Sequence, residues 1–245
     1  MKESLIRSIL EVEDQHWWFR GRRNVVSHVL EKFIPKPCGE VLEIGCGSGA
    51  NFSVLEPFGN LHAVEMDKVS RDAANKRGQT QVEDGYLPDG MPIDGDGFDL
   101  VAMLDVLEHI EKDKEAMVAV KGFLASGGHT IVTVPAFQAL WSHHDDLNFH
   151  FRRYSMKSLV GVLKAAGLDV LYCTYTFFTL FPMFATVRLL EKIKPNASRR
   201  SEKIHVPPVI VNDILGSLVS LEGSFMPMFR FPFGSSLLAV ARKPL

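Results

Sequence analysis

The sequence is poor in cysteine and nearly balanced in charge, and both features narrow the classes of protein to which it can belong. Its 245 residues include three cysteines, Cys38, Cys46 and Cys173, which are too few and too scattered for a disulfide framework or a zinc site. The formal net charge is -2, so we expect no basic surface of the kind that binds nucleic acid. These features favour a cytoplasmic protein without nucleic-acid partners.

Long hydrophobic runs are also scarce. Residues 1–15 contain acids throughout and no apolar stretch of signal-peptide length. Residues 170–187 are uncharged over 18 positions, close to the lower limit of about 17 residues for a membrane-spanning helix. They include four threonines, two tyrosines and Pro182, and only their first half alternates like a strand. We therefore expect a strand and a separate helix here, not a membrane span.

Strand-like apolar runs alternate with helical patterns along most of the chain. Strands are predicted at 40–44, 61–65, 79–83, 98–104, 129–134, 168–175 and 236–241. Helices are predicted at 22–34, 50–58, 68–77, 112–124, from Ser155 to Ala166, and at 177–194 and 207–222. Such alternation is typical of right-handed βαβ units and a parallel sheet. The polar stretch 195–206 is expected to be a loop.

The stretch 41–50, VLEIGCGSGA, places Gly45, Gly47 and Gly49 directly after an apolar run. Glycines at this density indicate a backbone that turns sharply and approaches a ligand closely, because no Cβ stands in the way. The pattern Gly45-x-Gly47-x-x-Ala50 fits the dinucleotide fingerprint. The same residues, taken as an acid followed by G-x-G-x-G, fit a loop for a positively charged ligand. The glycines alone leave both interpretations open.

Acidic residues at four predicted strand ends favour the second interpretation. They are Glu43, Glu65, Asp84 and Asp105. The carboxyl ends of the strands of a doubly wound sheet share one crevice. Extra carboxylates there would repel a pyrophosphate, because two like charges about 4 Å apart cost about 4 kcal/mol at intermediate dielectric. S-adenosylmethionine carries a ribose, an adenine, an ammonium and a sulfonium but no phosphate, so it fits the four acids.

Four motifs in order resemble the class I S-adenosylmethionine-dependent methyltransferases, in the group of small-molecule methyltransferase domains. They are VLEIGCGSG (41–49), AVEMD (63–67), VEDGYLP (82–88) and FDLVAMLDVLEHI (98–110), and SLLAVARKP (236–244) is similar to the family's last strand. The resemblance covers 40–175 and 235–244. It implies a doubly wound, mostly parallel seven-stranded Rossmann-like sheet with an antiparallel last strand.

The resemblance also implies one domain with four parts: an N-terminal helical cap (1–37), a cofactor-binding core (38–175), a helical insert (176–234) and the last strand (235–245). Glu43 would face the amino group of the cofactor, Glu65 the ribose, and Asp84 with the following backbone the adenine. Cys46 is expected to fill the tight loop, since no base accompanies it. The expected cofactor-binding residues are Glu43, Gly45, Cys46, Gly47, Gly49, Glu65, Met66, Asp84, Gly85, Tyr86 and Asp105.

The small-molecule methyl acceptor has weaker signals. His109 and His150 are the expected candidates for a general base, which an acceptor that is already a nucleophile does not need. Further expected acceptor contacts are Trp17, Trp18, His143, His144, Arg152, Arg153 and Tyr154. The arginines would hold an anionic group. We expect no metal, because adjacent residues such as His143 and His144 rarely chelate one ion together.

The apolar insert leaves two structural interpretations open. Its helices either pack onto the sheet or form a lid over the strand ends that encloses a hydrophobic or lipid-linked acceptor. Two other functions are weighed against methyl transfer. One is an NAD-dependent oxidoreductase, and the other is a non-catalytic cofactor-binding protein at a membrane surface, suggested by basic residues after the apolar segment 177–190.

Overall fold

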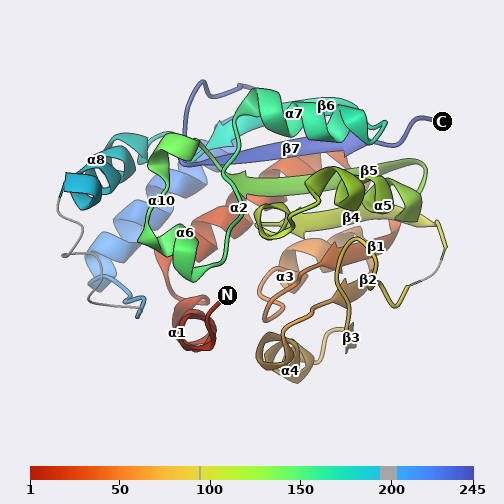
Figure 1. Cartoon of the computed structure of the whole chain (residues 1–245), viewed down its shortest axis with the longest axis horizontal. Coiled ribbons are helices and arrows are strands. Elements are labelled where there is room, and N and C mark those ends of the chain that lie inside the picture. Colours follow the sequence, from red (N-terminus) through yellow and green to blue (C-terminus); the bar gives the residue numbers. More distant parts are fainter. Residues whose placement is uncertain (94, 194–202) are drawn as a thin grey trace.

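A seven-stranded sheet of order β3-β2-β1-β4-β5-β7-β6 forms the centre of the computed structural model, which describes residues 1–93, 95–193 and 203–245 (Figure 1). Parallel pairings join β3 through β5, and β7 is antiparallel to both of its neighbours. The strands are β1 (Gly39–Ile44), β2 (Gly59–Val64), β3 (Val82–Glu83), β4 (Phe98–Leu104), β5 (Leu124–Pro135), β6 (Asp169–Thr176) and β7 (Ser236–Arg242). The predicted doubly wound sheet with an antiparallel last strand is confirmed.

Helices cover both faces of this sheet. One face carries α2 (Trp17–Phe33), α3 (Phe52–Leu55), α4 (Lys68–Arg77) and α10 (Val209–Phe225), and the other carries α5 (Asp113–Phe123) and α7 (Met156–Ala165). Alternate residues of β1 point to opposite faces, so Val41 belongs to one apolar cluster while Leu42 and Ile44 belong to the other. Burial on both faces explains why the parallel strands read as continuous apolar runs.

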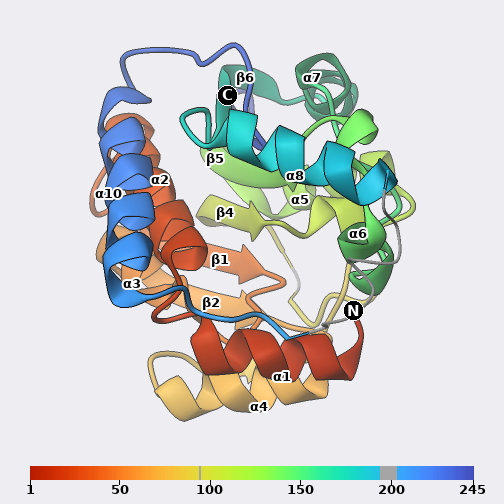
Figure 2. The same ribbon diagram turned by 90° about the vertical axis from the view of Figure 1, so that its left-hand side faces the viewer.

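Three further helices surround the carboxyl ends of the strands: α1 (Glu3–Val12), α6 (His143–Leu147) and α8 (Phe181–Ile193). Figure 2 shows α1 and α8 on opposite sides of these ends, with α6 beside them. The helical cap predicted for residues 1–37 therefore consists of α1 at the strand ends and α2 on the sheet face. The insert contributes α8 to the surroundings of the strand ends.

The second helix of the insert packs against the covered face of the sheet, which is one of the two positions that the sequence left open. It lies along α2 (Figure 2). A Cβ added to Gly21 of α2 would come within 2.7 Å of Val219 Cγ1, and one added to Gly223 of α10 would come within 3.3 Å of Val25 Cα. The two glycines thus allow the helices to approach closely. These two glycine contacts could not be foreseen from the apolar pattern of the sequence.

Several element boundaries differ from the prediction for local reasons. The strand predicted at 79–83 is reduced to β3, since Thr80 Oγ1 donates to Leu61 O (2.7 Å) and Val82 N donates to Asn75 Oδ1 (2.9 Å). The helix predicted at 50–58 splits into α3 and a 3₁₀ turn at Glu56–Phe58, which contains Pro57; proline lacks the amide that a continuing α-helix needs.

The apolar run 170–187 is divided between β6 and α8, as expected. Helix α8 begins at Phe181 instead of 177, because the amides of Phe178 and Thr179 donate to the Glu222 carboxylate at 3.0 and 2.9 Å. In the part of the chain that the structure describes, no helix has both the length and the apolar character needed to cross a membrane. Most of the loop predicted at 195–206 lies outside the described residues.

Candidate active site

A cavity of about 930 Å³ opens at the carboxyl ends of β1, β2 and β4. Its walls are the loops after these strands together with residues of α1, α2, α6 and α8. Ligand sites occupy roughly 300–1,000 Å³, so this cavity is at the upper end of that range and has room for two small molecules side by side. As expected from the topology, the loops after residues 44, 65 and 104 share it.

The glycine loop forms one wall of the cavity. Gly45, Gly47 and Gly49 have φ angles of 70°, 57° and 75°, in the left-handed region that side chains rarely adopt. An added Cβ would meet Val106 at Gly45 and the Phe52 ring at Gly49, whereas at Gly47 it would meet nothing within 4 Å in the described chain. Gly45 and Gly49 therefore allow Val106 and Phe52 to pack closely against the loop. Gly47 leaves its backbone open to the cavity.

Glu65 is held beside this loop by two backbone amides. Its carboxylate accepts from Gly47 N at 2.8 Å and from Asp67 N at 2.7 Å. Burial raises the pKa of Glu65, while the two amide hydrogen bonds oppose that shift. Because each carboxylate oxygen has a further lone pair, the side chain lining the cavity can still accept hydrogen bonds from two hydroxyl groups of a ligand.

Glu43 lies behind the cavity wall. It is fully buried, and its carboxylate accepts from Asn51 Nδ2 at 2.8 Å. Burial raises the pKa of Glu43 to about 8, and Oε2 of Glu43 has no hydrogen-bond partner in the described ranges. Asn51 lines the cavity and Glu43 does not. The structure therefore places an amide where the sequence suggested a carboxylate.

The third motif stands apart from the cavity. The Asp84 side chain is 70% exposed and pairs with Arg71 at 2.8 Å, and Arg71 also donates to Glu65 O at 2.7 Å. Tyr86 is exposed, and a Cβ added at the buried Gly85 would lie 2.7 Å from Val64 Cγ1. These three residues are not among those that line the cavity, whereas Cys46 and Met66 of the other motifs are.

Asp105 is paired with Arg22, a residue that was not among the predicted site residues. The Arg22 guanidinium forms an ion pair with Asp105 and lies 5.2 Å from the centre of the Trp18 ring. Thr133 Oγ1 donates to the other oxygen of Asp105 at 3.0 Å. Trp18 and Arg22 are four residues apart in the HWWFRGRR segment, which places them on one face of α2. The four-residue spacing of Trp18 and Arg22 was the feature of the sequence that could have indicated Arg22 as a site residue.

Both predicted tryptophans line the cavity. Trp18 stacks on Phe177 with ring centres 5.6 Å apart and an interplanar angle of 7°. Trp17 packs against Phe177 and Phe184, and its amide donates to Asn212 Oδ1 at 2.9 Å. The aromatic side chains on the cavity wall are Trp17, Trp18, Phe19, Phe149, Phe151 and Phe184.

The predicted acceptor residues are divided between the cavity and the surface or core. His109, His144, His150 and Arg153 line the cavity. Arg152 pairs with Asp113 at 2.7 Å, and the buried Tyr154 donates to the same carboxylate at 2.9 Å. His143 lies on the exposed side of α6, 3.8 Å from Asp146. Residues 152–154 are extended, so Arg153 points opposite to its two neighbours.

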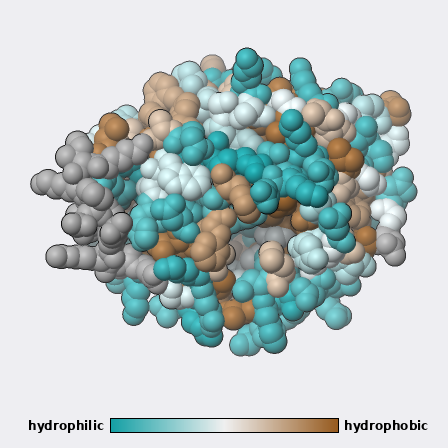
Figure 3. All heavy atoms as spheres, viewed as in Figure 1, coloured by the Kyte–Doolittle hydropathy of each residue, from teal (hydrophilic) through white to brown (hydrophobic). Residues whose placement is uncertain are grey.

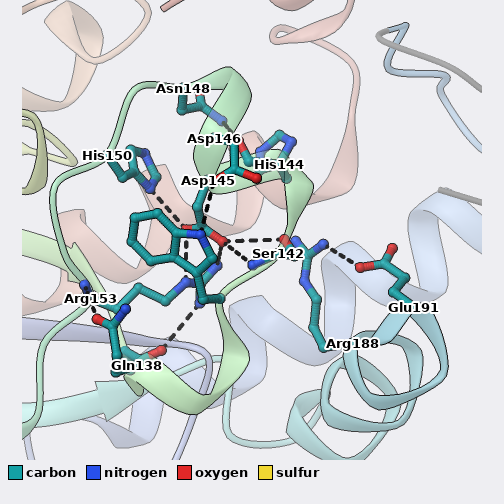
Figure 4. A network of polar contacts seen from close by, with 12 residues as sticks. Gln138, Ser142, His144, Asp145, Asp146, Asn148, His150, Arg153, Arg188 and Glu191 are labelled. Carbon is teal, nitrogen blue, oxygen red and sulfur yellow. Dashed lines mark hydrogen bonds and ion pairs between the residues drawn. The ribbon is translucent and has the colours of Figure 1, made fainter. Parts of the chain in front are cut away.

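Asp145 organises the polar wall of the cavity (Figure 4). It accepts from His150 Nδ1 at 2.9 Å, from Arg153 Nε at 2.7 Å and from Ser142 N at 2.8 Å. Burial alone would raise the pKa of Asp145, but the hydrogen bonds from His150 and Arg153 hold it well below its usual range. Burial lowers the pKa of His109 to about 4, so its ring is neutral at pH 7.

The family follows from comparison with known proteins. A family model described as a methyltransferase domain matches residues 18–172, more than half of the chain. The chain belongs to the class I S-adenosylmethionine-dependent methyltransferases. An uncharacterized protein of Methanocaldococcus jannaschii is 25% identical over 174 residues, which are 69% of this methyltransferase and 75% of that protein.

Solved structures share the fold at low sequence identity. A S-adenosylmethionine-dependent methyltransferase of Thermotoga maritima is 18% identical, with a TM-score of 0.58 and coverage of 98% of this chain and 99% of that one. Phosphoethanolamine N-methyltransferase 2 of Haemonchus contortus, in complex with phosphomonomethylethanolamine and S-adenosylhomocysteine, is 17% identical with a TM-score of 0.58. That match covers 89% of this chain but only 52% of the nematode enzyme.

The residues present fit S-adenosylmethionine, the cofactor of this family. The open backbone at Gly47 can approach the methionine portion, and Glu65 is placed to bind both ribose hydroxyls. The unpartnered Glu43 Oε2 and the Asn51 amide provide polar atoms near the loop. The cationic residue nearest the fourth motif, Arg22, is already neutralised by Asp105, which would leave a pyrophosphate without a counter-charge there.

Proposed function

We propose that this methyltransferase acts on a small, largely apolar acceptor. One observation supports the proposal above the others: a single cavity is lined by the Gly47 loop and Glu65, here named its cofactor end, and by a group of aromatic side chains, here named its acceptor end. Apolar pockets with a few polar groups are the usual form of small-molecule sites. Trp17, Trp18 and Phe184 would contact the acceptor, and the wall formed by His109, His150 and Arg153 would orient its polar end.

The chain's own residues would contribute position and water exclusion. S-adenosylmethionine, when bound, supplies an activated methyl group whose carbon–sulfur bond breaks toward sulfur. Glu65 and the Gly47 backbone would fix the cofactor, and the aromatic group would hold the acceptor in line, since orientation alone contributes much of the rate of such displacements. His109, neutral at pH 7, would take a proton from an acceptor that still carries one.

Transfer of a labelled methyl group tests this proposal. The purified protein, incubated with methyl-labelled S-adenosylmethionine and a fractionated extract of small molecules, should label an organic-extractable compound. Label that appears only in protein or nucleic acid, with none in the small-molecule fractions, would contradict the proposal. A heat-denatured sample controls for non-enzymatic transfer.

A second proposal concerns a membrane surface as the source of an apolar acceptor. Helix α10 buries one stripe against α2 but exposes another, in which every residue is at least 39% exposed: Val211, Ile214, Leu218, Leu221 and Phe225. An exposed apolar stripe of this length marks an interaction surface. The face of the molecule in Figure 3 is, in contrast, mostly hydrophilic with hydrophobic side chains interspersed.

Vesicle flotation tests this second proposal. The wild-type protein should float with vesicles that contain anionic lipid, and Ile214→Glu combined with Leu221→Glu should abolish flotation without changing cofactor affinity. Absence of flotation, together with a dimer in light scattering that the same double variant dissociates, would assign the stripe to a second copy of the chain instead.

A further inference from the structure

Three side chains that can ligate a metal converge on the wall of the cavity. One ligand atom each of Glu108, His109 and His150 lies within 4.8 Å of the other two, and all three residues line the cavity. Glu108 and His109 belong to the 3₁₀ turn Leu107–His109 after β4, and His150 follows α6. The amide of Phe151 donates to Glu108 O at 2.8 Å, which fixes the two segments against each other.

Glu108 is a buried carboxyl group without a full set of partners. The residue is 1% exposed, and its Oε2 has no hydrogen-bond partner among the described residues. A buried polar atom left unpaired is costly. A cation at this position would satisfy the orphaned oxygen and balance the charge.

His150 is already oriented by a partner on one ring nitrogen. Its Nδ1 faces the Asp145 carboxylate at 2.9 Å, and Asp145 is in turn held by Arg153 (Figure 4). Nε2 of His150 is therefore left to ligate, and the centre of the His109 ring lies 4.6 Å from the centre of the His150 ring. Histidines that bind metals almost always donate their second nitrogen to a carboxylate or a backbone carbonyl in this way.

We propose that Glu108, His109 and His150 bind one divalent transition-metal ion, with its remaining coordination positions open to the cavity. Two imidazoles and one carboxylate with open positions are typical of catalytic zinc and non-haem iron sites. Metal–ligand bonds of about 2.0–2.2 Å would draw the three ligand atoms to about 3–3.6 Å from one another. From separations within 4.8 Å, this is a contraction of at most about 1.2–1.8 Å, which side-chain rotation would have to supply.

This site differs from the expectation of no metal, which considered residues adjacent in the sequence. The three ligands come instead from the end of β4 and from the segment after α6, and only the fold brings them together. The adjacent residues His143 and His144 do not share a site: His144 lines the cavity, whereas His143 lies outside it beside Asp146.

The ion has a consequence for the acceptor that rests on the proposed methyl transfer: His109, as a ligand, would no longer take the acceptor's proton. An open coordination position facing the cavity would bind a hydroxyl oxygen and lower its pKa, so that the proton is released to water. The oxygen would then form a bond to the methyl carbon while the carbon–sulfur bond breaks and its electron pair stays on sulfur. The site therefore favours an oxygen acceptor with a hydroxyl group.

Cobalt absorption spectroscopy on the tag-free protein tests the metal site. Wild type, stripped with a chelator, should bind one Co²⁺ with visible bands of nitrogen ligation, and Zn²⁺ should displace it. Glu108→Gln and His150→Ala should each weaken binding at least 10- to 100-fold, the range found even for changes behind the ligands. His143→Ala, an exposed histidine of α6, should bind Co²⁺ like wild type.

The outcomes separate this proposal from the proposed function. Absence of saturable Co²⁺ or Zn²⁺ binding by wild type overturns the site, whatever the variants do. Equal binding by folded Glu108→Gln or His150→Ala also overturns it. Calorimetry with S-adenosylmethionine on the chelator-treated protein is independent of the metal: cofactor binding without metal binding removes only the metal site, and metal binding without cofactor binding removes only the methyl-transfer proposal.

Discussion

The two ends of the cavity are built from different parts of the chain. The cofactor end consists of short loops directly after β1 and β2, where the Gly47 amide donates to the Glu65 carboxylate at 2.8 Å. The proposed acceptor end is assembled from α2, α6, α8 and the turn after β4, which are far apart in the sequence. Backbone geometry determines the first end, and contacts between side chains of distant elements determine the second.

The largest effect is expected at the cofactor end. Gly47→Val should abolish S-adenosylmethionine binding, because a branched side chain would project into the open space of the cavity and occupy a left-handed conformation that costs about 1–2 kcal/mol. Gly78→Val is a matched control: Gly78 ends α4 with a φ of 73°, and an added Cβ there meets nothing within 4 Å in the described chain. Calorimetry should show loss of binding for Gly47→Val alone. Equal affinities in the two folded variants would show that the loop is only a turn.

A smaller loss is expected from Glu65→Ala. Removal of charge-assisted hydrogen bonds costs about 1.5–3 kcal/mol, or roughly 10- to 150-fold in affinity. Asp84→Asn changes an exposed carboxylate outside the cavity, and we expect it to alter the dissociation constant less than about 3-fold, within the range of a solvent-exposed ion pair. A larger loss for Asp84→Asn than for Glu65→Ala would reverse the roles of the second and third motifs.

These two residues also show what the sequence could and could not reveal. Glu65 was predictable because it ends a parallel strand beside the glycine loop, and a strand end has a defined place in the fold. Asp84 follows a strand that is only two residues long. The direction of the Asp84 side chain therefore depends on its ion pair with Arg71 and not on the sheet. Three residues of the cavity were missed because their roles depend on side-chain partners that only the fold brings together. Asn51 binds Glu43, 8 residues away, and Arg22 binds Asp105, 83 residues away. Asp145 binds His150 and Arg153, 5 and 8 residues away. The position of helix α10 was left open between two alternatives because it depends on glycine contacts with α2.

At the acceptor end, Phe184→Ala should lower turnover by about 10-fold while sparing cofactor affinity, since Phe184 is half-buried and its contact is worth about 1.5 kcal/mol, the lower end for an apolar side chain. Phe184 lines the cavity, whereas Phe181 packs on Phe137 and Phe233 away from it. Val118→Ala, at an exposed apolar position of α5, is the control. Steady-state kinetics on the identified acceptor would measure the effect; a parallel loss of cofactor affinity and thermal stability would assign Phe184 to the core.

The smallest effect is expected in the pH dependence of stability. Burial in the cavity wall lowers the folded pKa of His109 to about 4, below the ordinary value near 6.5. The unfolded chain therefore binds its proton first, and the free energy of unfolding falls as pH decreases from about 6.5 to 4. His109→Gln should reduce this fall, while His143→Gln, at an exposed position, should not. Urea unfolding of the metal-free protein at several pH values measures both, and identical slopes for the two variants would contradict a neutral His109 ring in the folded protein.

The central claim, that the cavity binds a sulfonium cofactor and not a dinucleotide, is tested most directly by calorimetric titration of the wild-type protein in one buffer. We predict that S-adenosylmethionine and S-adenosylhomocysteine bind at one site per chain, and that NAD produces no saturable heat. Saturable binding of NAD with no heat from S-adenosylmethionine would contradict the assignment of the Gly47 loop and Glu65.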